Sequence, residues 1–328
     1  MNSRERVIKA LNLEVPDRVP WIEAYIHREM VDKILKKKIS IPSFIRVPQE
    51  ISQFLELDNI TIDLRPPIFA EEKISSDGTH YFCKGLLTDW KDLEKFKLPN
   101  LEDGKLFNDI KIYLKRHRRD KCALLSMRAG PANTYLSMGI EDFSLKLYDD
   151  IKFVEYIMDI FTDWCCKIAS KAKYLGFDIV RIGEDWAYKS GSFFSRKIIN
   201  ELFLPRLERV VNLLEIPWIY HSDGNFMEYL DDILNLKPSG IANLEPASMD
   251  IEYLKDKYGK RVCLIGNISL DTLARGTKED TVNEVKDRIK KIGFGGGYIL
   301  SSENGITRYC KQENIIAMSN IITKYSHY

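Results

Sequence analysis

Short runs of β-branched and aromatic residues alternate with longer amphipathic stretches along most of the chain. This alternation is typical of a parallel sheet whose strands are connected by covering helices. Eight strand–helix units favour an α/β fold of the (β/α)8 TIM-barrel type, and no linker divides residues 1–328, so we expect a single barrel domain. The runs predicted as strands are residues 19–25, 60–64, 122–127, 178–182, 218–221, 240–244, 262–266 and 298–301.

The stretches between these runs place apolar residues three and four positions apart, which is the period of an amphipathic helix. Ser195 and Thr277 are expected to cap two of these helices, and Pro205 is expected to kink the first of them. The N-terminal helix is expected to close the bottom of the barrel. The predicted helices are residues 3–13, 151–175, 195–214, 226–236 and 277–292.

The first half of the chain is less regular than the second. Residues 74–85 have the pattern of a β-hairpin that turns at Asp77 and Gly78, because Asp-Gly favours tight hairpin turns. We interpret the hairpin as an excursion that covers one side of the barrel mouth.

Charge and composition exclude several classes of function. Lys and Arg number 49 against 48 Asp and Glu, so the net charge of +1 predicts no attraction to nucleic acid or to an anionic membrane. No signal sequence and no apolar run of about 18 residues is recognisable, which predicts no membrane span. The six cysteines are scattered without a CxxC pair. We interpret them as reduced thiols of a cytoplasmic protein.

Polar residues follow nearly every predicted strand. The carboxyl ends of barrel strands meet at one mouth, so these residues are candidates for an active site, although some would be merely solvated. The candidates are Glu23, Asp63, Arg65, Arg128, Glu184, Asp185, His221, Asp223, Glu245, Asn267, Ser302, Glu303 and Asn304.

His221 stands out because it is one of five histidines and directly follows a predicted strand. A neutral imidazole with nearby carboxylates would bind Zn²⁺ and leave one coordination position open. The same carboxylates would raise the pKa of His221 and make it a proton donor without a metal. A third interpretation is a structural histidine paired with one acid. The residues alone leave the three open.

Two glycine-containing segments differ in what they indicate. In Gly183-Glu184-Asp185-Trp186, the glycine lets the strand end approach a ligand and two acids follow at once, so Glu184 and Asp185 are predicted to be catalytic together with His221. Residues 295–297 are three glycines without the following lysine of a phosphate loop, and we interpret them as a tight connection.

Five segments together resemble the uroporphyrinogen decarboxylase-like superfamily, and the resemblance covers nearly the whole chain. The superfamily consists of (β/α)8 barrels with two chemistries. One group decarboxylates a haem precursor, and the other moves methyl groups between a substrate, a corrinoid protein and sometimes coenzyme M. The segments are RERV at residues 4–7, PDRVP at 16–20, GEDW at 183–186, HSDGN at 221–225 and CLIGNI at 263–268.

Departures from the family pattern favour the methyltransferases. The decarboxylases hold substrate carboxylates with arginines of an Arg-Gln-Ala-Gly-Arg-Tyr segment near the first strand. This chain has WIEAYIHR at residues 21–28 instead, and Glu23 there would repel a substrate with eight carboxylates. Uroporphyrinogen decarboxylation is therefore the alternative, and a non-catalytic barrel that binds a small ligand is the third hypothesis.

The methyltransferases that the chain resembles take zinc ligands from a His-x-Cys after strand five and a Cys near strand eight. His221 fits the first position, Asp223 replaces the first cysteine, and Asn304 beside Glu303 falls at the second. The resemblance thus implies an oxygen-rich zinc site of His221 with Glu184, Asp223 or Glu303.

The implied reaction transfers a methyl group from a small substrate, such as a methoxylated aromatic compound or a methylamine, to a corrinoid on a partner protein. Zinc would bind the heteroatom that carries the methyl group. Four aromatic side chains would surround an apolar substrate: Trp21, Tyr25, Trp186 and Tyr188. The predicted substrate-binding residues are Glu23, Tyr25, Arg128, Trp186, Asn225 and Asn267.

Overall fold

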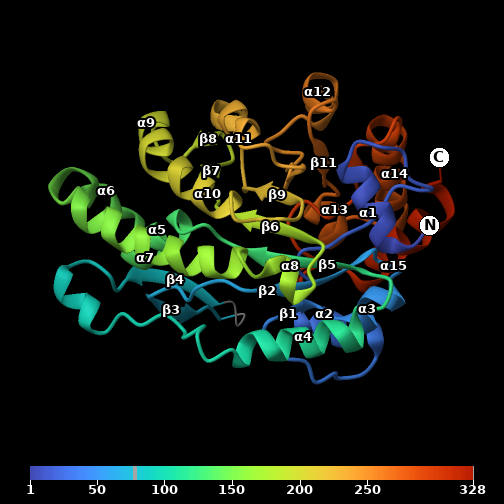
Figure 1. Ribbon diagram of the computed structural model, residues 1–328. Coiled ribbons are helices and arrows are strands. Elements are labelled where there is room, and N and C mark those ends of the chain that lie inside the picture. Colours follow the sequence, from blue (N-terminus) through green and yellow to red (C-terminus); the bar gives the residue numbers. More distant parts are fainter. Residues whose placement is uncertain (77–79, 328) are drawn as a thin grey trace.

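The structure is a computed structural model that describes residues 1–76 and 80–327. It has an α/β fold around an eight-stranded curled sheet (Figure 1), with strands in the order β1-β2-β5-β6-β9-β10-β11-β12. All neighbouring strands in this sheet are parallel except β1 and β2. The strands are β1 (Ile45–Val47), β2 (Asn59–Asp63), β5 (Cys122–Met127), β6 (Ile179–Gly183), β9 (Trp218–His221), β10 (Gly240–Ala242), β11 (Cys263–Ile265) and β12 (Tyr298–Ile299).

Seven of the eight predicted strands are present, with ends that differ by one or two residues. The prediction of a strand at residues 19–25 is wrong, since this segment forms only one isolated bridge, from Trp21 to Leu300 just after β12. The physical reason is that Pro20 has no N–H group to donate to a neighbouring strand. Two of the next backbone amides donate to side chains instead of to strand carbonyls. The N–H groups of Trp21 and Glu23 donate to the side chains of Asp58 and Asn59.

The helices cover the outside of the sheet, except α1, which packs against its inner side. Their bounds are α1 (Ser3–Leu11), α2 (Arg28–Leu35), α3 (Gln49–Phe54), α4 (Lys105–His117), α5 (Pro131–Met138), α6 (Ile140–Asp149), α7 (Ile151–Ala169), α8 (Ala172–Leu175), α9 (Arg196–Ile198), α10 (Leu204–Val211), α11 (Leu230–Asn235), α12 (Ile251–Tyr258), α13 (Leu270–Arg275), α14 (Lys278–Arg288) and α15 (Gln312–Tyr325).

The predicted helices are interrupted where local geometry changes. The stretch predicted at 151–175 is divided into α7 and α8. In the stretch predicted at 195–214, Ser195 caps α9 as expected, a π-helical turn follows at Ile199–Phe203, and Pro205 lies in the first turn of α10. Thr277 forms a capping box with Asp280 at the start of α14.

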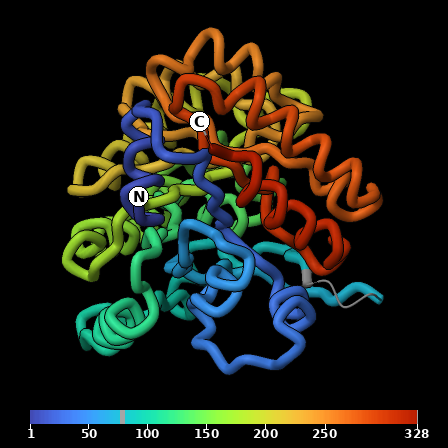
Figure 2. Tube along the Cα trace, turned by 90° about the vertical axis from the view of Figure 1, so that its right-hand side faces the viewer, coloured from blue at the N-terminus to red at the C-terminus, as the bar shows by residue number. Residues whose placement is uncertain are grey.

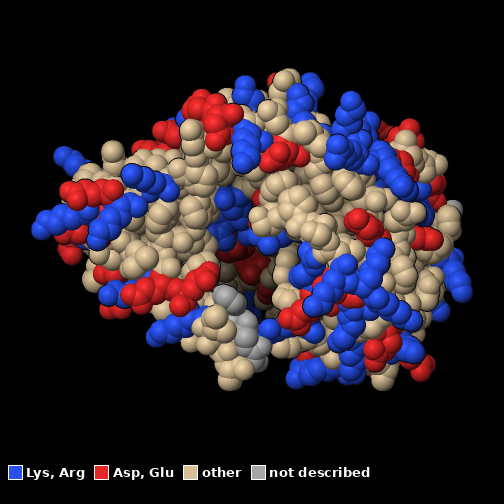
Figure 3. Space-filling model, turned by 90° about the horizontal axis from the view of Figure 1, so that it is seen from below, with Lys and Arg blue, Asp and Glu red and all other residues tan. Residues whose placement is uncertain are grey.

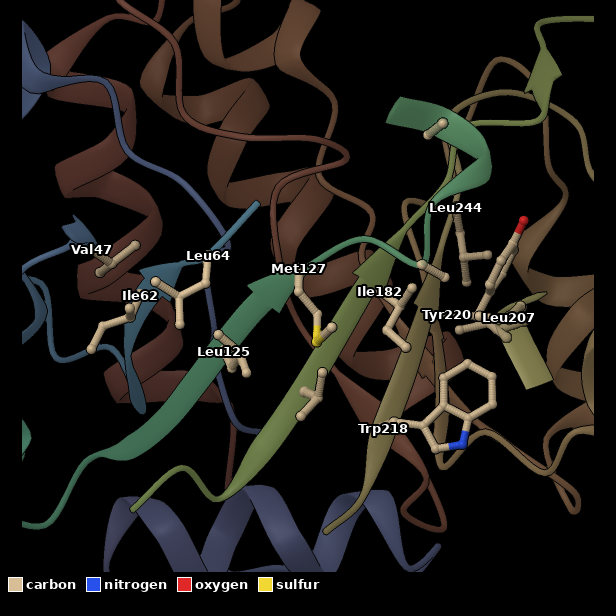
Figure 4. Close-up of a cluster of buried hydrophobic side chains, with 14 of the residues drawn as sticks. Val47, Ile62, Leu64, Leu125, Met127, Ile182, Leu207, Trp218, Tyr220 and Leu244 are labelled. Carbon is tan, nitrogen blue, oxygen red and sulfur yellow. The ribbon is translucent and has the colours of Figure 1, made fainter. Parts of the chain in front are cut away.

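Two apolar layers hold the sheet. The larger one lies between the sheet and the outer helices, where Ile62, Leu125, Met127 and Ile182 pack outward from successive strands (Figure 4). The second lies on the inner side, where α1 contributes Val7, Ala10 and Leu11. This inner layer also includes one or two residues from each of six strands: Cys122, Leu124, Ile179, Ile219, Ala242, Cys263, Ile265 and Ile299. The N-terminal helix, which we expected at the bottom of a barrel, therefore packs against the inner side of the sheet.

The hairpin predicted at 74–85 is present as β3 (Ala70–Ile74) and β4 (His80–Gly85), which pair antiparallel. The predicted turn at Asp77 and Gly78 lies outside the described residues. Figure 1 shows the hairpin with α6 and α7 at the end of the molecule away from both termini. A second small antiparallel pair, β7 (Ala187–Tyr188) and β8 (Gly191–Ser192), follows β6.

The two ends of the chain lie side by side (Figure 2), where the Val19 amide donates to the Ser326 carbonyl at 2.8 Å. Within residues 1–76 and 80–327, no helix has both the length and the apolar character of a membrane span. The six cysteines are all unpaired.

We expect Leu11→Ala to lower the free energy of unfolding by about 2–5 kcal/mol, because Leu11 is buried against the inner face of the sheet. Urea denaturation followed by circular dichroism measures the change. Leu145→Ala on exposed α6 is the control and is expected to stay within about 0.5 kcal/mol of the wild type. Equal destabilisation by both changes would contradict the role of α1.

Candidate functional site

Asp185, His221 and Asp223 meet just beyond the carboxyl ends of β6 and β9. Nε2 of His221 lies 3.5 Å from Oδ1 of Asp185 and 3.4 Å from Oδ1 of Asp223. One ligand atom from each of the three residues lies within 4.8 Å of the others. In the part of the chain that the structure describes, this is the one group of three or more His, Cys, Asp and Glu with such spacing. We call it the His–Asp trio.

The trio is positioned by the parallel register of β6 and β9. Gly183 is paired with His221, and the Glu184 amide donates to the His221 carbonyl at 3.1 Å. A Cβ atom at position 183 would lie 3.3 Å from Cδ2 of His221. The missing side chain of Gly183 therefore lets the imidazole lie directly against the neighbouring strand.

Asp185 occupies a constrained turn after β6. Its φ of 49° is in the left-handed region, which Asp tolerates better than most residues but which still stores strain. The Tyr135 hydroxyl lies 3.0 Å from the Glu184 carbonyl and 2.9 Å from the Asp185 carbonyl, close enough to donate to either. This contact fixes the turn and directs the Asp185 carboxylate toward His221.

Asp223 is held by hydrogen bonds with three residues. Nδ2 of Asn304 donates to its carboxylate at 3.2 Å and Nδ2 of Asn243 makes a second, shorter contact. The Asp223 amide in turn donates to Oδ1 of Asp185 at 3.2 Å. Burial opposes ionisation of Asp223, but the close contact with His221 and the nearby Arg181 outweigh it and lower its pKa.

The expectation that nearby acids raise the pKa of His221 is wrong. Burial lowers the pKa of His221, and the adjacent Arg181 guanidinium lowers it further, while Asp223 and Asp185 oppose the shift without overcoming it. The imidazole is therefore neutral at physiological pH. A neutral imidazole is the form that binds a metal ion.

Two other predicted acids have different partners. The Glu184 carboxylate accepts the amides of Ala129 at 2.5 Å and Ala132 at 2.9 Å, and burial raises its pKa to about 7. The Glu303 carboxylate accepts the Leu270 amide at 2.7 Å. Neither acid is part of the trio, because Glu184 points to the loop after β5 and Glu303 to the start of α13.

A cavity of about 280 Å³ opens beside the trio. Arg46, Arg65 and Arg181 line it together with Asp63 and Tyr25, and Arg181 lies next to His221. We call this space the arginine cavity. Figure 3 shows a hollow with acidic residues in its depth and basic residues around it.

A second cavity of about 710 Å³ shares Asp185 and Asp223 with the first. Phe82 of the hairpin, Tyr188 and Phe193 line it, and we call it the aromatic cavity. Arg128 also lines it, with Nε and Nη1 buried and without a hydrogen-bond partner. The two carboxylates of the trio thus separate a polar space from a larger and more apolar one.

The predicted substrate-binding residues fall into two groups. Tyr25 lines the arginine cavity and Arg128 the aromatic cavity. The other four line neither cavity, and each has partners within the protein. Glu23 accepts hydrogen bonds from Trp21 and Ser302, Trp186 donates to Glu184, Asn225 accepts the Met227 amide, and Asn267 donates to the Leu244 carbonyl.

Arg46 and Arg181 are cavity residues that were not predicted from the sequence. Arg181 carries a signal, since it is a charged residue inside the apolar run of β6, where all five residues are buried. Arg46 lies on the short strand β1, and no sequence pattern distinguishes it from a solvated arginine.

The fold and the site together define an α/β protein with a ligand cavity at the carboxyl ends of its parallel strands. Residues 73–325 match the family model described as uroporphyrinogen decarboxylase (URO-D). The chain belongs to the uroporphyrinogen decarboxylase family. No curated protein matches the chain.

Solved structures share the fold at low sequence identity. A methyltransferase from Methanosarcina mazei is 19% identical, with a TM-score of 0.77 over 99% of each chain. A B12-independent methionine synthase from Shewanella sp. W3-18-1, in complex with selenomethionine, is 15% identical with a TM-score of 0.51 over 84% of this chain and 85% of that one.

Glu23 is expected to make the free energy of unfolding depend on pH, because burial raises its pKa from 4.5 to about 7. The folded state binds this proton more tightly, so the contribution of Glu23 to stability is complete below pH 4.5 and is lost as the pH rises through 7. We expect Glu23→Gln to reduce the difference in free energy of unfolding between pH 5 and pH 8 by roughly 3 kcal/mol. The amide can still accept from Trp21 and donate to the Ser302 hydroxyl.

Urea denaturation at the two pH values measures this effect. Glu201→Gln on the exposed surface is the control and is expected to leave the difference unchanged. A Glu23→Gln protein with the pH dependence of the wild type would contradict a neutral Glu23.

Proposed function

We propose that this chain is a methyltransferase that moves a methyl group from a small methylated molecule to a corrinoid on a partner protein, with Zn²⁺ bound by the His–Asp trio. The observation that carries the proposal is the spacing within the trio. Tetrahedral zinc with ligand bonds of about 2.0–2.1 Å separates neighbouring ligand atoms by roughly 3.4 Å. The two distances from Nε2 of His221 are 3.4 and 3.5 Å.

A pair of direct hydrogen bonds explains these distances less well. An imidazole N–H that donates to a carboxylate normally lies about 2.7–3.2 Å from it. His221 also has a lowered pKa, which disfavours the charged form that an ion pair needs. One neutral nitrogen and two carboxylate oxygens fit a three-ligand zinc site with an open position.

Bound zinc would act as a Lewis acid toward the heteroatom that carries the methyl group. The chain itself would orient the ligands. Asn304 and Asn243 hold the Asp223 carboxylate, and the Tyr135 hydroxyl holds the turn of Asp185. These contacts keep both carboxylates at one edge of the arginine cavity, so a small substrate there would be placed with one end at the trio.

We assign the methyl donor to the arginine cavity and the approach of the corrinoid to the aromatic cavity. The arginine cavity is small and polar, whereas the aromatic cavity is larger and lined by Phe82, Tyr188 and Phe193. A methyl carbon at the trio would then face both spaces, as a transfer between two molecules requires. Methoxylated aromatic compounds and methylamines remain the candidate donors.

We further infer that the sheet closes into a TIM barrel and that the chain is one domain. The segment before α2 supports closure from both sides. The Ile22 amide donates to the Leu300 carbonyl at 3.0 Å, and the Asp58 amide donates to the Trp21 carbonyl at 2.7 Å. Residues 20–26 thus occupy the place between β12 and β2 where an eighth parallel strand would lie.

Decarboxylation of a porphyrinogen is the second candidate function. Its support is the matched family together with Arg46, Arg65 and Arg181, which offer cations to carboxylates. The arginine cavity of about 280 Å³ alone is too small for a tetrapyrrole with eight carboxylates, which would also have to occupy the adjoining aromatic cavity of about 710 Å³. A third possibility, a silent barrel that binds a small ligand, predicts neither reaction.

We expect the purified protein to hold close to one zinc ion per chain and His221→Ala to lose it, because a site of three protein ligands binds weakly with two. Elemental analysis after dialysis measures the zinc content. His117→Ala on α4, remote from the trio in sequence and structure, is the matched control and should keep the metal. Equal zinc content in both variants would contradict the trio as the binding site.

The reaction itself is tested with methylated donors and free cob(I)alamin as the acceptor. We expect formation of methylcobalamin, seen in the visible spectrum, with a loss of at least about a hundredfold in rate in His221→Ala. Release of carbon dioxide from uroporphyrinogen, with no methyl transfer, would support the second candidate instead. Neither reaction, with a tightly bound small molecule, would support the silent barrel.

A further inference from the structure

We propose that Arg46, Arg65 and Arg181 form a subsite for a carboxylate, so that the small molecule in the arginine cavity is a methylated monocarboxylic acid. The assignment rests on the proposed function, because Zn²⁺ at the trio would neutralise the two carboxylates that otherwise balance the charges of the arginines. The carboxylate would lie at the arginine wall and the methyl-bearing end at the trio.

Arg181 provides the strongest evidence for the subsite. Its side chain is 7% exposed, and Ser126 Oγ, at 3.2 Å, is the hydrogen-bond partner of its guanidinium among the described residues. No carboxylate in this part of the chain lies within the 4.0 Å of an ion pair with it. The charges of Asp185, Asp223 and Asp63 favour the charged form of Arg181 from beyond ion-pair distance. A ligand carboxylate would supply the direct partner that this buried guanidinium lacks.

Arg181 remains charged in this position. Burial lowers its pKa to about 10, and the neighbouring Arg65 contributes to the decrease. A pKa of this size leaves the guanidinium protonated at neutral pH. An anion bound against it would remove the repulsion between the two arginines.

The other two arginines share a single carboxylate. Oδ1 of Asp63 forms an ion pair with Nε of Arg65 at 2.8 Å, and Oδ2 accepts a hydrogen bond from Nε of Arg46 at 3.0 Å. Burial opposes ionisation of Asp63, but Arg65 and Arg46 outweigh it and lower its pKa. The hydroxyl of Ser126 is contacted by Arg65 at 3.0 Å and by Arg181 at 3.2 Å, which brings these two guanidinium groups together.

The charges around the cavity leave a place for an anion. The arginine wall has three positive charges against the one negative charge of Asp63, an excess of two. Asp185 and Asp223 balance that excess across the cavity. A divalent cation at the trio would neutralise those two carboxylates, and the excess on the arginine wall would then be met by substrate.

Size and geometry select the kind of acid. A space of about 280 Å³ corresponds to roughly nine water molecules, so the ligand is small. Guanidinium groups bind planar carboxylates through two parallel hydrogen bonds. Tyr25 adds an aromatic wall, and the Arg46 guanidinium lies 5.9 Å from its ring centre.

The test compares an acid with its neutral isostere. The probes are methoxyacetate and methoxyacetamide, titrated into the full chain by calorimetry. We expect the wild type to bind the acid at least about tenfold more tightly than the amide, since hydrogen bonds between charged groups contribute that much or more. Arg181→Met is expected to abolish the preference, and Arg181→Lys to leave part of it, because charge remains without the planar fork.

Controls separate the subsite from general effects. Arg65→Met, at a half-exposed position, should weaken acid binding even if Arg181→Met fails to fold. Arg209→Met on the outer face of α10 should leave the preference unchanged, since Arg209 pairs with Asp159 and Asp163 and not with the cavity. Equal binding of acid and amide by the wild type, or an intact preference in both cavity variants, would overturn the proposal.

Two further binding measurements separate the carboxylate subsite from the proposed methyl transfer. In the variant with Asp185→Asn and Asp223→Asn, the trio is neutral and cannot hold zinc, so a remaining preference for the acid belongs to the arginines. Its loss there would assign the acid to the trio and overturn the subsite. Inorganic phosphate is the tetrahedral probe, and tighter binding of phosphate than of methoxyacetate would overturn the assignment to a carboxylate.

Discussion

The parallel register between β6 and β9 is the constraint on which the site depends. Gly183 faces His221 across the two strands, so the residues that follow each strand end leave the sheet at the same level. A slip of one residue would exchange the two faces of a strand and turn His221 toward the outer helices. The apolar layer that contains Ile182 and Tyr220 resists such a slip, because both side chains would leave the core.

Neighbouring residues of a strand point to opposite faces, which explains why the adjacent acids Glu184 and Asp185 have different surroundings. Glu184 continues the direction of β6 and is enclosed by the loop after β5, where two backbone amides satisfy its carboxylate. Asp185 is the first residue of the turn, and its left-handed backbone directs the side chain the other way. Desolvation therefore raises the pKa of Glu184 to about 7. The Asp185 carboxylate instead lines the arginine cavity beside His221 and Asp223.

Much of this arrangement is predictable from the sequence because it follows local rules. Strand positions, the capped helices, the hairpin and the place of His221 all come from periodicity and from the polarity of strand ends. The false strand at 19–25 and the missed strand β1 have one cause, which is that side chains and short antiparallel pairing replaced the regular ladder there. Which of several acids would meet the imidazole was not predictable, since that depends on a single turn geometry at Asp185.

The arginines show a different limit of sequence reasoning. The absence of the arginine segment near the first strand indicated that a substrate with eight carboxylates is disfavoured, yet three arginines reach the cavity from β1, the end of β2 and the interior of β6. A charge tolerated inside a fully buried strand has to be satisfied from within the fold or by a ligand. Ser126 supplies one neutral acceptor to Arg181, which is too little for a buried guanidinium. The buried position of Arg181 therefore says more about the ligand of this cavity than any motif at the strand ends.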